Sequence, residues 1–577
     1  MRINGMRKRL SRIPRVWKWI GGITLVILII LLVMAGFYAR NWKPNIKSKL
    51  EKIIQESSKG LYALTYDDIE LHILTGTIRM SNAELISDSI VYREQVASKI
   101  ASDSRFHIKL KSLEVKGVSL WSALIRKKLF IKHIILHEVD LRVLNEPHAY
   151  NDTVKTKNTI SPYDRIKDRF KSVQVNKVSL DHFNIIHTKT EQGEAHTIKV
   201  DSAQFRFYDI LVDKNSELDS TRLYYFKAVQ VDIPRFDYEI PNSPYKVGFE
   251  RLAMDSREDV LLVTKVSLSP RISKVDYFRH DKENKALISL NFDTVRLEKA
   301  RFRELFDRQR ISSKCVHVVG GTASFHKDKR FQKDNVNKIG DAPHQKILAV
   351  DQLLYFDTVF VENVDLSYHE LSGKYLREGV LTFQQVHGNI TNVTNDKTQL
   401  KNDKFMRADL GANLMDSGAL HAVFGFDMLS ENGSHSYAGT LGSMEISAFN
   451  RIITPLLNLQ FASGNIHGIR FDMRGNDYRN WGKLYFDYDQ LKVNLLYPPD
   501  EEDNKREKRG ILTFLINQLL VNDSNPDTNE VYHIGEVDYK RVPEYSHFKT
   551  IWKSLQEGLQ QTLGLSESSK IKLKERE

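Results

Sequence analysis

The chain has 577 residues, of which 41% are apolar and 27% charged, a composition typical of a folded protein rather than a disordered one. Its single cysteine, Cys315, excludes an intrachain disulfide. Seven of the positive charges lie in residues 1–19, which contain no acidic residue, so the rest of the chain contributes only +5 to the net charge of +12. A nucleic-acid partner is therefore not expected.

An uncharged segment of twenty residues, Ile20 to Ala39, follows the basic one. As a helix rising about 1.5 Å per residue it would be about 30 Å long, the thickness of a bilayer core. Trp19 and Trp42 flank it, as suits the membrane interface. A cleaved signal peptide is the alternative, but its apolar part is usually about 7–15 residues long. We therefore expect a transmembrane helix at 20–39, with residues 1–19 in the cytoplasm and the bulk of the chain across the membrane.

Beyond a predicted exit helix at 40–60, the chain repeats one eight-residue pattern: apolar–polar–apolar–polar, then polar–apolar–polar–apolar. Two copies lie in the nearly identical stretches "KSLEVKGVSL" at 111–120 and "KSVQVNKVSL" at 171–180. A random chain of this composition would contain about two copies. This chain contains eleven, which begin at Leu64, Ile78, Ile108, Leu113, Val173, Val178, Ile198, Val231, Leu290, Val295 and Phe486.

The pattern predicts strands with one apolar face, because successive side chains of a strand point to opposite sides. Two adjacent polar residues shift this alternation by one, which would turn the second half of a regular strand to the wrong face. A β-bulge at the polar pair would keep both halves on one face and bend the strand. A tight two-residue turn would do the same, although arms of three residues are short for a hairpin. Either solution predicts a curved sheet that is apolar on one side.

Helical patterns are few. Short helices are expected at 120–128, 301–310 and 446–459. An amphipathic helix is expected at 546–564. We favour the interpretation that this helix covers the end of the sheet, and the alternative is that it docks on a membrane or a partner. Its apolar positions are Phe548, Ile551, Trp552, Leu555, Leu559 and Leu563. The expected domain order is a basic segment at 1–19, a transmembrane helix at 20–39, an exit helix at 40–60, sheet at 61–326, a polar linker at 327–346, sheet at 347–497, a charged linker at 498–509, a helical and strand cap at 510–565 and a charged tail at 566–577.

No catalytic motif is found: the chain has no HExxH, GxSxG, Walker loop, GxGxxG after a strand, or CxxC. His133 and His137 would lie on the same face of one strand, where a solvated surface is a better interpretation than a metal site. We therefore expect no enzyme, no cofactor and no metal.

The expected strands, about 20–25 of them, offer more apolar surface than the few helices can cover. The sheet must therefore pack on itself, as in closed sandwiches or barrels, or lie against something apolar that is not protein. The predicted fold class is mainly β: an N-terminal transmembrane helix, then an elongated, twisted, partly open antiparallel β-groove with a few short helices.

Three stretches resemble the AsmA-like family of bacterial envelope proteins. The block "IKLKSLEVKGVSLWSALIRKKLFIKHIILHEVDLRV", from Ile108, has the strand, short helix, strand order of that family's N-terminal region. "LHILTGTIRMSNAELIS", from Leu71, resembles the hairpin after the family's anchor, and "GKLYFDYDQLKVNLL", from Gly482, resembles its C-terminal repeat. The resemblance spans nearly the whole chain but lies in degenerate patterns.

The resemblance implies a bridge-like carrier of phospholipid between the inner and outer membranes, anchored in the bacterial inner membrane by Ile20 to Ala39 with its bulk in the periplasm. It leaves room for a periplasmic or outer-membrane partner at the C-terminal end. The alternative is a non-enzymatic envelope scaffold or outer-membrane assembly factor with closed β-sandwich cores. The expected lipid-contacting residues are Leu113, Val115, Val118, Leu120, Ile134, Leu136, Val173, Val175, Val178, Leu180, Leu290, Phe292, Val295, Leu297, Phe486, Tyr488, Leu491 and Val493.

Overall fold

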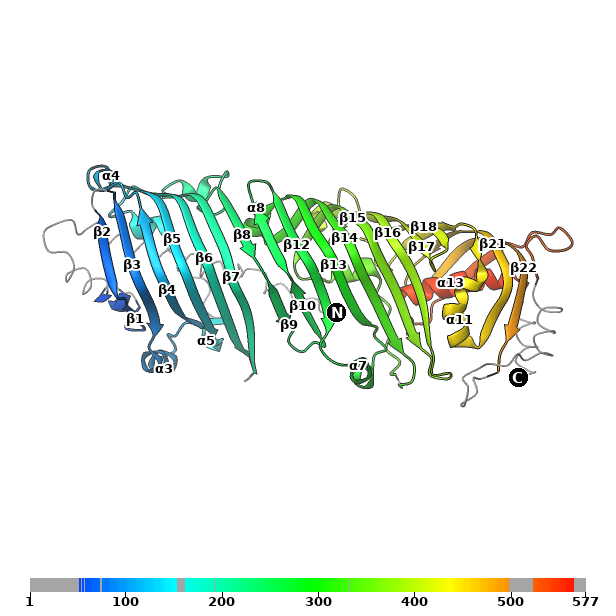
Figure 1. Cartoon of the computed structure of the whole chain (residues 1–577). Helices are drawn as coiled ribbons and strands as arrows, with labels where there is room; N and C mark the ends of the chain where they lie inside the picture. Colours follow the sequence, from blue (N-terminus) through cyan, green and yellow to red (C-terminus); the bar gives the residue numbers. More distant parts are fainter. Residues whose placement is uncertain are drawn as a thin grey trace. The chain divides into compact units, whose positions relative to one another are not determined.

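The computed structural model describes residues 51–564, apart from 53, 57, 73–74, 153–160, 192–193, 332 and 498–521. The described strands form one long, open, mostly antiparallel sheet of 23 strands with a few short helices, which confirms the predicted mainly β class (Figure 1). The predicted transmembrane helix at 20–39, the charged linker at 498–509 and the tail at 566–577 lie outside the described residues. Within the described ranges, no helix is both long enough and apolar enough to cross a bilayer.

The chain divides into two compact units. Unit 1 comprises residues 1–241, 249–263 and 301–309, and unit 2 comprises 242–248, 264–300 and 310–577, so that β10 (Tyr245–Phe249) and β12 (Val260–Pro270) have residues in both. The other described elements of unit 1 are β1 (Tyr62–Thr65), β2 (Asp68–His72), β3 (Thr77–Ser87), α3 (Ser89–Ala97), β4 (Ser104–Lys116), α4 (Leu120–Arg126), β5 (Lys128–Asn145), α5 (Ala149–Asp152), α6 (Pro162–Ile166), β6 (Ser172–Glu191), β7 (Glu194–Asp213), η1 (Ser216–Leu218), β8 (Ala228–Ile233), β9 (Phe236–Glu239), β11 (Arg251–Asp255) and α8 (Phe302–Arg308).

Unit 2 contains the remaining elements. These are α7 (Lys274–His280), β13 (Leu287–Ala300), β14 (Arg310–Asp328), α9 (Pro343–Leu348), β15 (Leu353–Leu371), β16 (Glu378–Thr394), α10 (Lys397–Leu400), β17 (Phe405–Leu414), β18 (Gly418–Asp427), β19 (His435–Leu441), β20 (Met444–Glu445), η2 (Ile446–Phe449), α11 (Asn450–Leu457), β21 (Leu459–Gly475), β22 (Arg479–Leu495), β23 (Gly535–Lys540) and α13 (His547–Thr562).

The two units repeat one strand order. In unit 1, β4 pairs antiparallel with β5, β5 pairs parallel with β6, and β6 pairs antiparallel with β7. In unit 2, β13, β14, β15 and β16 have the same sequence of pairings, and each begins 181 to 184 residues after its counterpart. The sequence did not show this repeat, because the duplicated stretches at 111–120 and 171–180 both lie within one copy of it, the first across the end of β4 and the second at the start of β6.

A predicted β-bulge is present at the polar pair of β6. Asp181 and His182 of β6 together lie opposite Gln204 of β7, and His182 has a left-handed φ of 53°. Because β6 continues unbroken across this pair, the break is a bulge and not a hairpin turn. The second polar residue of six of the eleven copies has a left-handed φ: Asn82, Gly117, His182, Ser202, Lys299 and Gln490.

The bulge recurs in the second copy of the strand order. Glu362 and Asn363 of β15 lie opposite His387 of β16, and Asn363 has a φ of 53°, the value found at His182. On the neighbouring parallel strands, Glu138 of β5 and Gly320 of β14 also have left-handed φ angles, of 47° and 66°. In both units, a residue with left-handed φ on the parallel neighbour therefore lies level with the bulge.

The three short helices expected from the sequence are confirmed as α4, α8 and α11. Each is followed at once by a residue with a φ of 52°, namely Lys127, Gln309 and Asn458, and then by a long strand. A left-handed residue at this position ends a helix because its N–H bonds back to a carbonyl of the last turn. The same helix-to-strand junction therefore starts β5, β14 and β21.

Helix α13 packs on β22 and β23, and four of its six expected apolar positions face the sheet: Ile551 is buried, and Leu555, Leu559 and Leu563 pack against the same cluster. Phe548 and Trp552 are 62% and 45% exposed, although both were expected on the buried face. The close approach of the helix to the sheet explains the difference, because a Cβ on Gly535 of β23 would lie 2.5 Å from the carbonyl oxygen of Gly558. Small side chains fit that spacing, and the buried residues of α13 are accordingly His547, Thr550, Ile551, Ser554, Gly558 and Thr562.

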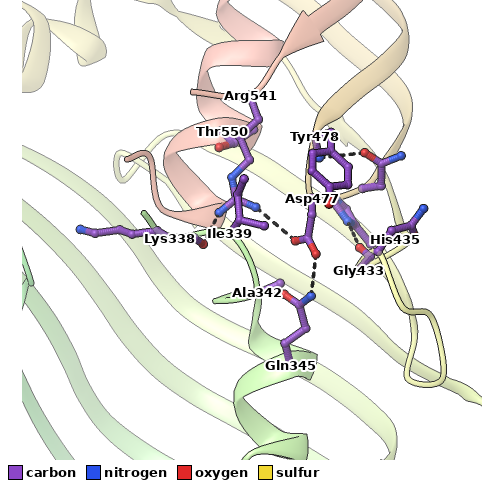
Figure 2. A network of polar contacts seen from close by, with 12 residues as sticks. Lys338, Ile339, Ala342, Gln345, Gly433, His435, Asp477, Tyr478, Arg541 and Thr550 are labelled. Carbon is purple, nitrogen blue, oxygen red and sulfur yellow. Dashed lines mark hydrogen bonds and ion pairs between the residues drawn. The ribbon is translucent and has the colours of Figure 1, made fainter. Parts of the chain in front are cut away.

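A buried ion pair holds the segment before α13 in place (Figure 2). The guanidinium of Arg541 lies 3.3 Å from Asp477 Oδ1, and both side chains are less than one-tenth exposed. Gln345 Nε2 donates to the other carboxylate oxygen of Asp477 at 2.8 Å, and Arg541 donates to the carbonyl oxygens of Lys338 and Tyr545 at 2.6 and 3.1 Å. The network joins the segment that precedes α9 to the C-terminal part of unit 2, although the sequence predicted only a polar linker at 327–346.

Candidate functional site

In unit 2 the paired strands place apolar side chains in continuous rows on one face. Directly paired residues of neighbouring strands point to the same side of a sheet. Two such rows cross β13, β14, β15, β16 and β17 in that order. The first consists of Leu290, Ala323, Leu366, Phe383 and Leu414. The second consists of Leu297, Val316, Val359, Ile390 and Ala408. The name open apolar face of unit 2 is used below for the following residues on this side of the sheet: Leu290, Phe292, Val295, Leu297, Val316, Val318, Ala323, Val359, Val361, Leu366, Phe383 and Ile390.

Most side chains of this face remain partly accessible. In β15, which has 19 residues, only Val364 is fully buried, and in β12, in both units, none of the eleven residues is. Phe292, Leu366 and Phe383 are all half-buried. A face of valine, leucine and phenylalanine that its own chain does not fully cover is the feature that marks ligand grooves and contact surfaces.

The opposite face of the same strands is polar. Ser289, Ser324, Ser367 and Thr382 are paired across β13, β14, β15 and β16, and the hydroxyl oxygens of Ser324 and Ser367 lie 2.9 Å apart. This sheet is therefore apolar on one side only, as the sequence pattern predicts.

The expected contact residues of unit 1 lie in a different environment. Leu113, Val115, Ile134, Leu136, Val173, Val175 and Val178 share the apolar side of β4, β5 and β6, but they belong to one cluster of residues that are at most 8% exposed. Val118 and Leu180 are partly buried against it, and the side chain of Leu120 lies outside the described residues. This part of the sheet therefore has a closed core.

The expected residues at the other end are also buried. Phe486, Tyr488, Leu491 and Val493 of β22 are 2–6% exposed and share a cluster with Ile551 of α13. Of the four expected residues of β13, Leu290, Phe292 and Val295 are partly accessible on the open apolar face, whereas Leu297 is only 9% exposed.

The sequence missed the rest of the open apolar face. In β14, Val318, Val319 and two glycines follow one another, so the strand does not match the eight-residue pattern although Gly320 is at its bulge. In β15 the stretch from Val359 differs from the pattern at one position. The mismatch in β15 is Phe360, which stands at a polar position, and the mismatches in β14 are Val319 and Gly321, on the two sides of Gly320. A search that tolerated one mismatch would have found β15 but not β14.

The histidines considered as metal ligands in β5 lie on its polar face. His133 Nε2 is 2.9 Å from Ser179 Oγ, and burial, with the charges of Lys177 and Lys116, lowers the pKa of His133. His137 Nδ1 lies 4.0 Å from Asp181. These contacts fit a hydrogen-bonded strand surface.

Neither a scan of protein-family models nor a search of curated proteins gives a match to this chain. What the structure establishes is the sheet architecture and the two kinds of apolar face. The resemblance to AsmA-like proteins therefore continues to depend on the residue patterns and on this architecture.

Proposed function

We propose that the protein is an AsmA-like, non-enzymatic envelope protein that holds or conducts phospholipid along the open apolar face of unit 2. The observation that carries the proposal is the continuous set of apolar rows across β13, β14, β15 and β16, in which Leu290, Leu366 and Phe383 remain partly accessible, with a polar face behind them. In this proposal the segment at 20–39 anchors the chain in the bacterial inner membrane, and the bulk of the chain lies in the periplasm.

Acyl chains suit this surface better than a soluble metabolite would. Each methylene group removed from water contributes about 0.8 kcal/mol, so a chain lying across several rows would gain several kcal/mol without any polar contact. The rows contain few groups that could recognise a polar ligand, whereas the lipid head group can remain in water at the edge of the sheet.

The closed core of unit 1 favours a second candidate, a scaffold or outer-membrane assembly factor. Ile131, Val139 and Val173 are completely buried there, and such a core needs no lipid to cover it. If unit 2 also closes in the cell, by pairing with a protein partner, lipid would not enter.

Site-specific photo-crosslinking in cells separates these candidates. A crosslinker at Leu366, on the open apolar face, should capture phospholipid, whereas one at the next residue, Ser367, on the polar face, should not. A crosslinker at the buried Val175 serves as a second control. Capture of protein alone at Leu366 would refute the lipid proposal and support the scaffold.

A matched pair of substitutions tests the same face by function. Leu366→Asp should abolish co-purification of phospholipid, measured by mass spectrometry of the detergent-extracted protein, while Ser367→Asp should retain it. Circular dichroism should show the same strand content in both variants, and retention of lipid by a folded Leu366→Asp protein would contradict the proposal.

A further inference from the structure

Two histidines and a glutamate meet on the polar face of unit 2, at the ends of three neighbouring strands. His326 of β14 and His369 of β15 are direct partners in the parallel pair, and Glu378 is the first residue of β16. One possible ligand atom from each residue lies within 4.8 Å of the other two. Across the described residues, this is the one group of three or more His, Cys, Asp or Glu side chains that meets this criterion.

The contacts of His369 leave one ring nitrogen free to bind. Its Nε2 lies 3.2 Å from Ser367 Oγ, which also contacts Ser324 Oγ at 2.9 Å. This contact turns Nδ1 toward Glu378 Oε2, 3.5 Å away. Nδ1 is buried and has no hydrogen-bond partner among the described residues, although it faces the Glu378 carboxylate. Such a contact to the second ring nitrogen is how proteins orient metal-binding histidines.

His326 completes the arrangement from the neighbouring strand. Its ring centroid lies 4.4 Å from that of His369, and Lys274 Nζ, from the start of α7, lies 3.3 Å from its Nδ1. Lys274 would therefore compete with a cation for this ring.

The repeated strand order does not require these residues. At the corresponding positions of unit 1, Leu144 of β5 and Thr188 of β6 are paired in the same parallel register. The histidine pair is thus an addition to one copy of a shared framework, which argues for a role beyond building the sheet.

We propose that His326, His369 and Glu378 bind one divalent transition-metal ion, for which Zn²⁺ is the best match. Two imidazoles and one carboxylate are a donor set that Zn²⁺ uses, with a water molecule as fourth ligand. Ligands at about 2.0–2.1 Å from the ion would draw the three side chains together by small rotations. The ion would tie the ends of β14, β15 and β16 to one another on the face opposite the apolar rows.

Isothermal titration calorimetry of ZnCl₂ into the EDTA-treated, detergent-extracted full chain tests the site. The native protein should bind one Zn²⁺ tightly, and the variant His326→Ala/His369→Ala should lose at least about 100-fold in affinity, with Ser367→Ala about tenfold weaker than native. Lys274→Ala should bind more tightly. Zn²⁺ should raise the melting temperature of the native protein and leave that of the double variant unchanged.

Matched controls separate this site from general histidine binding. His421, which lies 2.7 Å from Asp409 on the surface of β18, is exposed and belongs to no such group. His421→Ala should bind Zn²⁺ like the native chain. Equal binding by the native chain and the double variant, or no saturable binding by the native chain, would overturn the proposal. The outcome is independent of lipid, since the apolar face lies on the other side of the sheet.

Discussion

The ion pair of Asp477 and Arg541 provides a quantitative test of how the C-terminal part of unit 2 is held. Arg541→Met keeps most of the side-chain volume but leaves the Asp477 carboxylate buried without its cation. Removing one partner of a buried pair costs about 3–5 kcal/mol, because the remaining charge is uncompensated. For a unit of this size, each kcal/mol lowers the melting temperature by about 2 °C, so we expect a fall of about 6–10 °C.

Differential scanning calorimetry measures the change, and hydrogen exchange over 535–562 should report faster opening of β23 and α13. The double variant Asp477→Asn/Arg541→Met should recover part of the loss, because it buries no charge. The control Lys265→Met breaks a 2.6 Å pair with Asp293 whose side chains are both more than half exposed, and should cost less than about 1 kcal/mol. A fall of under 2 °C for Arg541→Met would refute the reasoning.

Three further predictions follow from the fold. Burial lowers the pKa of His547 to about 2. Below about pH 6.5 the unfolded chain therefore binds a proton at this residue that the folded chain does not. The free energy of unfolding should decrease on acidification by up to about 1.4 kcal/mol per pH unit. His547→Asn should flatten this slope in urea titrations from pH 7 to 5. Gly558→Val should detach α13 from β23, lowering the melting temperature and exposing protease sites, while Gln556→Ala should not. Deleting His182 should prevent folding, because Phe183 and the rest of β6 would face the wrong side, whereas His182→Gly should fold at least as stably as the native chain.

The sequence predicted the strand pattern well because alternation and its interruption are local. The two polar residues at Asp181 and His182 predicted a bulge that the backbone confirms. Which apolar rows are covered is not local, since Val175 and Leu366 have similar surroundings in sequence but one is 3% exposed and the other half-buried. Coverage depends on packing between distant elements.

The two exposed positions of the expected α13 face have the same origin. Phe548 and Trp552 have the spacing of a buried stripe, but the distance between helix and sheet is set by Gly535 and Gly558, which are far apart in sequence. His326 and His369 are likewise 43 residues apart, and only the parallel register brings them together.

The bulge of β6 also bears on how such a sheet finds its register. Alternation penalises a strand displaced by one residue but not by two, since every side chain then keeps its face. In strands of 20 residues such as β6 and β7, many displaced pairings would therefore be almost equally good. A bulge removes this ambiguity, because Asp181 and His182 fit opposite Gln204 and at no position two residues away. Each completed strand thus fixes the register of the next, because the polar pair that interrupts its pattern allows only one alignment.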